Sequence, residues 1–202
     1  MLRIALAAAL AAAGMVPGGT AAVTVRPMLH AHNCYPEKGA WADRLDRALA
    51  TGGAPVAIEQ DIAWDPARGV PVVSHDNELT GTEPTLEAHF FDRMRPLLDR
   101  ALAGRRRERW PLYVLHLDFK TNEPAHHRAV WALLGKYERW LTTAARGTDE
   151  YDVRPLEAGP LLVLTENGEN QAAVFHDAVP AGGRLRLFGT LPSAKSGVLD
   201  LI

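Results

Sequence analysis

Apolar residues recur along this chain with two alternating spacings, one typical of strands and one typical of helices. Short apolar runs or runs of period two predict strands, and longer segments with apolar residues three and four apart predict helices. After a first apolar stretch that ends at residues 30–32, strands are predicted at 56–62, 70–74, 112–120, 161–165 and 185–189, with 198–202 beginning another. Helices are predicted at 41–51, 85–103, 125–141 and 171–178, and Pro96 is expected to kink or split the second.

Strands that alternate with helices in this order predict an α/β fold with parallel strands. Polar residues at the carboxyl ends of successive strands are typical of a TIM-type (β/α) barrel, whose active face lies at that end. A full barrel has about eight strand and helix units and typically ~250 residues. The chain has 202 residues, in which we count six strands and a possible seventh. The prediction is therefore a TIM-type barrel that is incomplete at its C-terminus.

Composition and charge narrow the class of protein further. With 47% hydrophobic and 23% charged residues, the chain is typical of one globular domain with a sizeable core. Its formal net charge of -2 argues against a nucleic-acid partner, because domains that bind nucleic acid usually present a basic surface. The sequence leaves the oligomeric state open.

The amino-terminal segment resembles an export signal. Residues 1–22 combine Arg3, an apolar run too short to span a bilayer and small residues at 20–22, which predicts a signal peptide and an exported protein. An uncleaved amino-terminal anchor is the alternative. Residues 23–202 then form a single domain without a predicted membrane span. Cys34 is the only cysteine, so no disulfide can form within the chain. We interpret it as a small residue that fills a loop, and a nucleophile paired with His32 is the alternative.

Titratable side chains stand at the ends of several predicted strands. Glu59 and Asp61 are two residues apart inside an alternating run, so both carboxylates point to the same face of a strand. His30 and His32 show the same offset, and His75 follows another apolar run. Charged groups at inward positions are costly unless they are paired or bind a metal. The pattern therefore predicts that these side chains converge on one site.

The strand at 112–120 repeats this pattern. His116, Asp118 and Lys120 alternate there with apolar neighbours, which adds three polar side chains to the predicted site. His30 and His116 are expected to support the site or pack in the core rather than react. His126 and His127 begin the next helix beside a polar loop, so both are expected to be exposed.

Four motifs in this order resemble the glycerophosphodiester phosphodiesterase and phosphatidylinositol phospholipase C-like superfamily. They are His32-Asn33, Glu59-x-Asp61, His75-Asp76 and Asp118-x-Lys120-Thr121, and the resemblance covers roughly residues 28–123. The opening HAHNCY is similar to the HxHNDY variant of one branch, with Cys34 where that branch commonly has Asp. The later LDFKT is similar to the DLKT of sphingomyelinase D-type members.

The resemblance implies a metal-dependent phosphoric diester hydrolase or lyase that acts on a glycerophosphodiester or a phospholipid head group. It assigns one divalent cation to a set of three carboxylates, an acid-base role to two histidines and substrate contacts to two further residues. These are Glu59, Asp61 and Asp118; His32 and His75; and Lys120 and Asn33. Oxygen ligands favour Mg²⁺ or Ca²⁺ over zinc.

His32 is expected to act as base and His75 as acid, although the two roles can be exchanged. Lys120 either contacts the phosphate or fixes a metal ligand. Two other interpretations stay open. The pair His30-x-His32 is also compatible with an amidohydrolase-like metallohydrolase, which needs further histidines at later strand ends. A degenerate barrel that binds a ligand without catalysis is the third.

Overall fold

The computed structural model describes residues 28–37, 40–51, 55–104, 107, 110–149, 151–166, 168 and 170–190. The predicted signal peptide and the predicted strand at 198–202 lie outside these ranges. The strands are β1 (Leu29–Ala31), β2 (Val56–Asp65), β3 (Val70–Val73), β4 (Tyr113–Phe119), β5 (Thr143–Ala145), β6 (Leu156–Glu157), β7 (Leu161–Glu166), β8 (Arg184–Leu185) and β9 (Phe188–Thr190). The helices and helical turns are α1 (Arg44–Ala50), η1 (Glu87–Phe91), α2 (Asp92–Ala103), α3 (Pro124–Lys136), η3 (Glu138–Trp140) and η4 (Ala173–Asp177).

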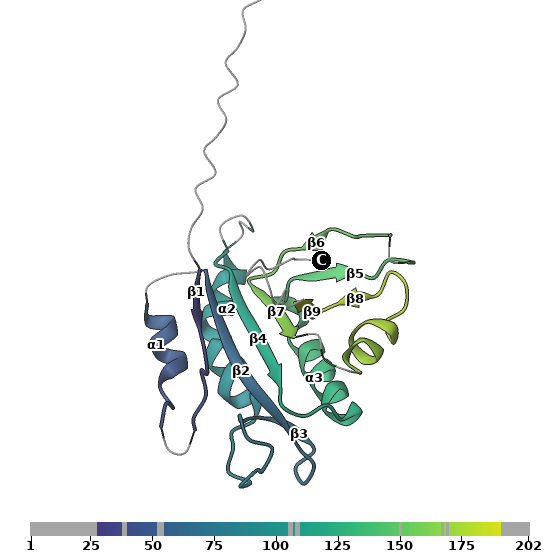
Figure 1. Cartoon of the computed structure of the whole chain (residues 1–202). Coiled ribbons are helices and arrows are strands. Elements are labelled where there is room, and N and C mark those ends of the chain that lie inside the picture. The colour runs from purple at the N-terminus through teal and green to yellow at the C-terminus, as the bar shows by residue number, and fades with distance from the viewer. Residues whose placement is uncertain are drawn as a thin grey trace, which may run out of the picture.

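The main sheet is mostly parallel. Its strands follow the order β1-β2-β4-β7-β9, and each neighbouring pair along this path is parallel. The spatial order of these strands is also their order in the chain (Figure 1). The structure is thus a mixed α/β fold with a mostly parallel central sheet, which confirms the predicted fold class at this level. Within the described ranges, no helix has the length and apolar character needed to cross a membrane.

The two faces of the main sheet carry different side chains. Ile58 and Ile62 of β2 point to one face, where they join a buried cluster with residues of α1, α2 and α3. Figure 1 shows α2 behind the sheet on this side. The opposite face holds a smaller buried cluster, formed around Ala57 by side chains from β2, β4, β7 and β9 alone. Glu59 and Asp61 alternate with the isoleucines and therefore belong to this second face.

The prediction that residues 70–74 form another strand of a parallel series is wrong in direction. β3 exists, but it pairs antiparallel with the end of β2. The reason is the connection: Asp65 accepts hydrogen bonds from the backbone amides of Ala67 and Arg68, and Gly69 adopts a positive φ of 67°. This turn reverses the chain at once, whereas a parallel connection needs a crossover of a dozen or more residues.

The last part of the chain also differs from the prediction. The segment expected as one strand at 185–189 is divided between β8, which pairs with β5, and β9, which pairs with β7. β5, β6 and β8 form a separate three-stranded sheet, of which β5 and β6 were not predicted. Pro96 does not split its helix, because α2 runs through it; the π-helical turn η1 directly precedes α2.

His126 and His127 are fully buried, so the prediction that both are exposed is wrong. They lie one helical turn before Val130 and extend the buried stripe of α3 toward its start. The ring of Phe119 packs against both imidazoles, at centroid distances of 5.0 and 5.3 Å. The hydroxyl of Thr121 lies 2.9 Å from His126 Nδ1. Periodicity, rather than the polarity of the side chain, decides burial here.

Burial lowers the pKa of His126 to about 4, from an ordinary value of 6.5. The folded chain therefore holds this ring neutral at pH values where the unfolded chain protonates it. The free energy of unfolding should fall as the pH drops from 6.5 toward 4, by up to about 3 kcal/mol from this group. We expect His126→Phe to flatten this part of the pH dependence, as measured by urea unfolding at pH 7 and pH 4.5.

The matched control is His176→Phe, which makes the same replacement at an exposed histidine on η4 and so separates the effect of the substitution itself from the effect of burial. An equally steep loss of stability in His126→Phe and in the unaltered chain would contradict the assignment to His126.

Candidate functional site

The register between β2 and β4 brings the polar residues of these strands together. Glu59 pairs with His116, and Asp61 pairs with Asp118. Paired residues of neighbouring strands project to the same face, and the strands lie ~4.8 Å apart. Lys120 follows Asp118 by two residues and lies just past the end of β4. The carboxyl ends of these two strands thus share one polar site.

Three carboxylates form an acidic cluster at this site. One side-chain oxygen from each of Glu59, Asp61 and Asp118 lies within 4.8 Å of the others. Glu59 is 5% exposed and Asp61 is 1% exposed, so two of the three charges are withdrawn from water. The structure therefore brings the three predicted metal ligands together. Buried carboxylates at this separation require compensating charge.

Lys120 supplies part of that charge. Its Nζ lies 2.6 Å from Asp118 Oδ2 and 3.1 Å from Asp61 Oδ2. Burial disfavours the charged ammonium, but the hydrogen bonds to Asp118 and Asp61 outweigh it and raise the pKa of Lys120. In formal charges, one ammonium against the three carboxylates of the cluster leaves two negative charges. Lys120 is thus placed to fix two of the predicted metal ligands.

Two loops attach to the same edge of β2 beside the cluster: the first follows β1 and the second follows β3. The backbone amide of Cys34 donates to the carbonyl of Glu59 at 3.2 Å, and the amide of Ser74 donates to the carbonyl of Asp61 at 3.0 Å. In the first loop, the backbone amide of Asn33 also donates a hydrogen bond to Glu59 Oε2 at 2.9 Å. Asn33 has a positive φ of 54°, a conformation that Asn tolerates better than most residues. Each loop carries one of the predicted catalytic histidines.

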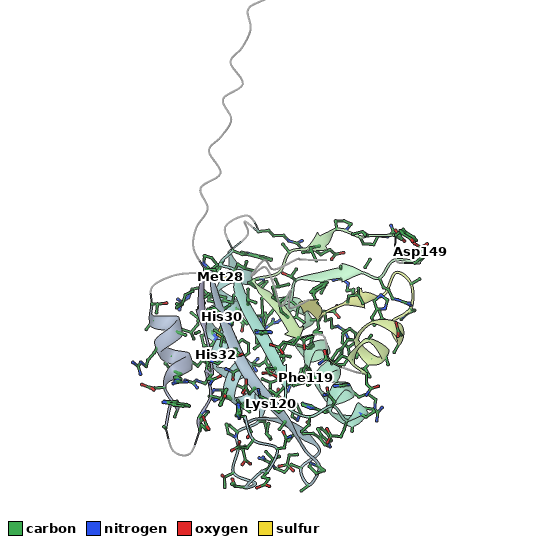
Figure 2. All side chains as sticks on the ribbon, in the orientation of Figure 1. Met28, His30, His32, Phe119, Lys120 and Asp149 are labelled. Atoms are coloured by element: carbon green, nitrogen blue, oxygen red, sulfur yellow. The ribbon has the colours of Figure 1, made fainter. Side chains whose placement is uncertain are left out.

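The two histidines are held differently. His32 Nε2 lies 3.1 Å from Glu59 Oε2, so its ring contacts the acidic cluster directly. Figure 2 shows His32 nearer than His30 to the end of the sheet where Lys120 lies. His75 follows Ser74, and its Nδ1 lies 3.6 Å from Oδ1 of the neighbouring Asp76. Both imidazoles are largely exposed, with side-chain exposures of 69% and 53%, and can meet a ligand from solvent.

Tyr35 is a site residue that the sequence analysis missed. Its side chain is fully buried, and its hydroxyl donates to Asp61 Oδ2 at 2.8 Å. Burial and this hydrogen bond raise the pKa of Tyr35, so the hydroxyl stays protonated and remains a donor. The motif HAHNCY contains this residue, and an aromatic hydroxyl two positions after Asn33 was the available signal.

Cys34 lies beside these groups and is buried, with a free thiol. Burial raises the pKa of this thiol to about 11, which keeps it protonated near neutral pH. Its Sγ lies 3.4 Å from the carbonyl oxygen of Ala31 and donates to it. These observations favour the interpretation of Cys34 as a residue that fills the loop, because a nucleophilic cysteine needs a lowered pKa.

His30 and His116 lie on the same face of the sheet, further from the carboxyl ends of the strands than Asp61 and Asp118. Their ring centroids are 5.9 Å apart. Burial, followed by the charge of His116, lowers the pKa of His30. Nε2 of His116 is buried and has no hydrogen-bond partner within the described residues. His116 pairs with Glu59 of the acidic cluster across the two strands, and the supporting role expected for His30 and His116 stays a prediction.

An unsatisfied oxygen tests whether the cluster fits a cation. Asp61 Oδ1 is buried and has no hydrogen-bond partner among the residues described. Oδ2, in contrast, accepts a hydrogen bond from the Tyr35 hydroxyl and forms an ion pair with Lys120. A buried carboxylate oxygen without a partner is costly. A hard divalent cation would satisfy this oxygen and offset the two remaining formal charges. The residues present therefore fit Mg²⁺ or Ca²⁺.

A cavity of about 550 Å³ lies elsewhere, between β7, β9 and the three-stranded sheet. Its walls are mainly apolar, and Leu164, Phe175 and Leu187 contribute to them. None of the seven predicted site residues lines it. The acidic cluster and the predicted catalytic histidines therefore lie outside this cavity.

Comparison of the chain with protein-family models, with curated proteins and with solved structures gave no match. The interpretation of the acidic cluster consequently depends on its own geometry and chemistry.

We expect the chain to bind one divalent cation at the acidic cluster, with Mn²⁺ as a paramagnetic stand-in for Mg²⁺ or Ca²⁺. Asp118→Asn removes one charged ligand while keeping the shape of the side chain. Loss of a supporting residue typically costs 10–100-fold in metal affinity, so loss of a direct ligand should cost at least as much. Titration followed by electron paramagnetic resonance measures the affinity.

Asp65→Asn is the matched control, because Asp65 is a buried carboxylate of β2 that pairs with Arg68 outside the cluster. It should retain the affinity of the unaltered chain for Mn²⁺. Equal affinities in Asp118→Asn and in the unaltered chain would show that the carboxylates do not share an ion.

Proposed function

We propose that this protein is a metal-dependent phosphodiesterase of the glycerophosphodiester phosphodiesterase and phospholipase C-like superfamily. The observation that carries the proposal is the acidic cluster of Glu59, Asp61 and Asp118, whose oxygens lie within 4.8 Å of one another. His32 borders it at 3.1 Å from Glu59. A cation can stabilise the negative charge of a phosphodiester, and an imidazole beside it can transfer the proton that hydrolysis needs.

We also propose that the sheet is part of a TIM-type barrel. The parallel strands follow chain order, and the main buried cluster joins α1, α2 and α3 to one face of the sheet. A barrel has this arrangement, with eight parallel strands and the helices outside. Five parallel strands lie among the residues described. The acidic cluster then occupies the inner face near the carboxyl ends of the strands, where barrel enzymes carry their active sites.

The side chains suggest a division of work. A bound divalent cation would supply positive charge for a phosphate oxygen and for the hydroxyl that attacks. Lys120 and Tyr35 hold Asp61 and Asp118 in place through their hydrogen bonds. In this proposal His32 takes a proton from a substrate hydroxyl or a water and His75 donates one to the leaving oxygen, or the reverse. Asn33 and Lys120 remain candidates for contact with the substrate.

Two alternatives call for different observations. An amidohydrolase-like enzyme would hold zinc through His30 and His32, but His32 contacts Glu59 and the cluster ligands are all oxygens. Tightly bound zinc in the purified protein would favour that enzyme class. A degenerate barrel would bind Mn²⁺ and a phosphodiester without turnover.

The proposal predicts chelator-sensitive hydrolysis of bis(4-nitrophenyl) phosphate or of a glycerophosphodiester, with a bell-shaped dependence of rate on pH. His32→Ala and His75→Ala should each lower turnover by about 100- to 10,000-fold and remove one limb of the profile. The measurement is the steady-state rate from pH 5 to pH 9, with and without a chelator.

His176→Ala is the matched control, since His176 is an exposed histidine beside an aspartate, as His75 is. Its rate should equal that of the unaltered chain. Full turnover in His75→Ala would show that the assignment of His75 is wrong.

A further inference from the structure

One backbone oxygen of the first loop receives two side-chain donors. Gln60 Nε2 lies 2.7 Å from the carbonyl oxygen of Cys34, and His89 Nε2 lies 2.9 Å from the same oxygen. Gln60 is fully buried, and His89 is 6% exposed. Gln60 comes from β2 and His89 from η1, so residues from two elements meet at one point of the loop.

The position of Gln60 is informative because of the face that it occupies. It alternates with Glu59 and Asp61 and therefore points away from the acidic cluster, into the face that otherwise carries Ile58 and Ile62. A polar side chain in an apolar layer is costly unless it is hydrogen-bonded. Its Nε2 donates to the carbonyl oxygens of Cys34 and Glu59, at 2.7 and 2.8 Å, whereas its buried Oε1 has no hydrogen-bond partner among the described residues.

The contacts of His89 define its protonation. A carbonyl oxygen only accepts, so Nε2 carries the proton that is donated to Cys34. Nδ1 lies 3.5 Å from Nη1 of Arg93, which only donates, so Nδ1 is the acceptor. Arg93 is held in turn by Asp46 of α1 at 2.6 Å. Burial lowers the pKa of His89, in keeping with a neutral ring in one tautomer.

The segment that these donors hold, residues 32–35, carries much of the site. It contains His32 beside Glu59, the Asn33 amide that donates to Glu59, and Tyr35, which donates to Asp61. The carbonyl of Cys34 lies in the middle of this segment. A shift of that carbonyl would move all three contacts with the carboxylates together.

We propose that Gln60 and His89 are positioning residues that hold segment 32–35 through the Cys34 carbonyl and thereby set its contacts with the acidic cluster. Neither side chain contacts a reacting group. The expected consequences for metal affinity and turnover depend on the proposed function, whereas the expected order of the segment does not.

The test uses the full chain and four variants. Gln60→Leu and His89→Phe remove one donor each at similar volume, and His89→Gln retains an N–H donor in place of Nε2. Gln171→Leu is the control, because Gln171 is a buried glutamine that bonds to Thr165 rather than to this segment. The measurements are hydrogen exchange of the Asn33 and Cys34 amides, Mn²⁺ affinity, and turnover of bis(4-nitrophenyl) phosphate.

We expect faster amide exchange in Gln60→Leu and His89→Phe, and a loss of about 10–100-fold in Mn²⁺ affinity or turnover. His89→Gln should recover most of this loss, and Gln171→Leu should show none. If Gln60→Leu does not fold, the two His89 variants decide the question.

Unchanged exchange and unchanged Mn²⁺ affinity in folded His89→Phe would overturn the proposal, as would a loss in His89→Phe that His89→Gln does not relieve. If the amides exchange faster in Gln60→Leu and His89→Phe but the unaltered chain cleaves no phosphodiester, the positioning role is supported and the proposed function is refuted.

Discussion

The pairing of β2 with β4 is the constraint on which the site depends. This pairing sets Asp61 beside Asp118 at the carboxyl ends of two parallel strands, while the alternation along β2 adds Glu59 to the same face. If either strand slipped by one residue, its polar side chains would turn to the opposite face, among the isoleucines and the helices. The apolar layer on the helix side thus fixes the register that assembles the carboxylates.

Because of the same alternation, the two faces of β2 have different roles. On one face, Ile58 and Ile62 pack against the helices, and Gln60 holds the first loop through the Cys34 carbonyl. On the other face, the carboxylates receive the Asn33 amide, the Tyr35 hydroxyl and the Lys120 ammonium. Burial of Glu59 and Asp61 costs free energy, which these donors offset only in part. Oδ1 of Asp61, which is buried without a hydrogen-bond partner among the described residues, shows most clearly that part of this cost is not offset.

Much of this arrangement could be predicted from local patterns in the sequence. The two-residue spacing of Glu59 and Asp61 indicated a shared face, and the strands and helices around them were found in the right order. The meeting of Asp61 with Asp118 could not be derived from spacing, because it depends on which strands are neighbours. The general expectation that polar strand ends converge pointed to it, and the resemblance of four motifs to a known superfamily named these residues as one set.

The errors have identifiable physical causes. The four-residue turn before β3 was visible in the sequence and is too short for a parallel crossover, so length was the neglected signal. His126 and His127 share a helical stripe with Val130 and Leu134, but their polarity suggested exposure. Gln60 and His89 carried no pattern of their own, because their role appears only when the loop of Cys34 folds against them.

The central claim is that the carboxylates of two neighbouring strands share one cation. Anomalous diffraction from crystals soaked in Mn²⁺ locates bound ions independently of any assay. The account predicts a single strong peak within bonding distance of Glu59, Asp61 and Asp118. Crystals that show no peak there at saturating Mn²⁺, with Lys120 still bridging Asp61 and Asp118, would contradict it.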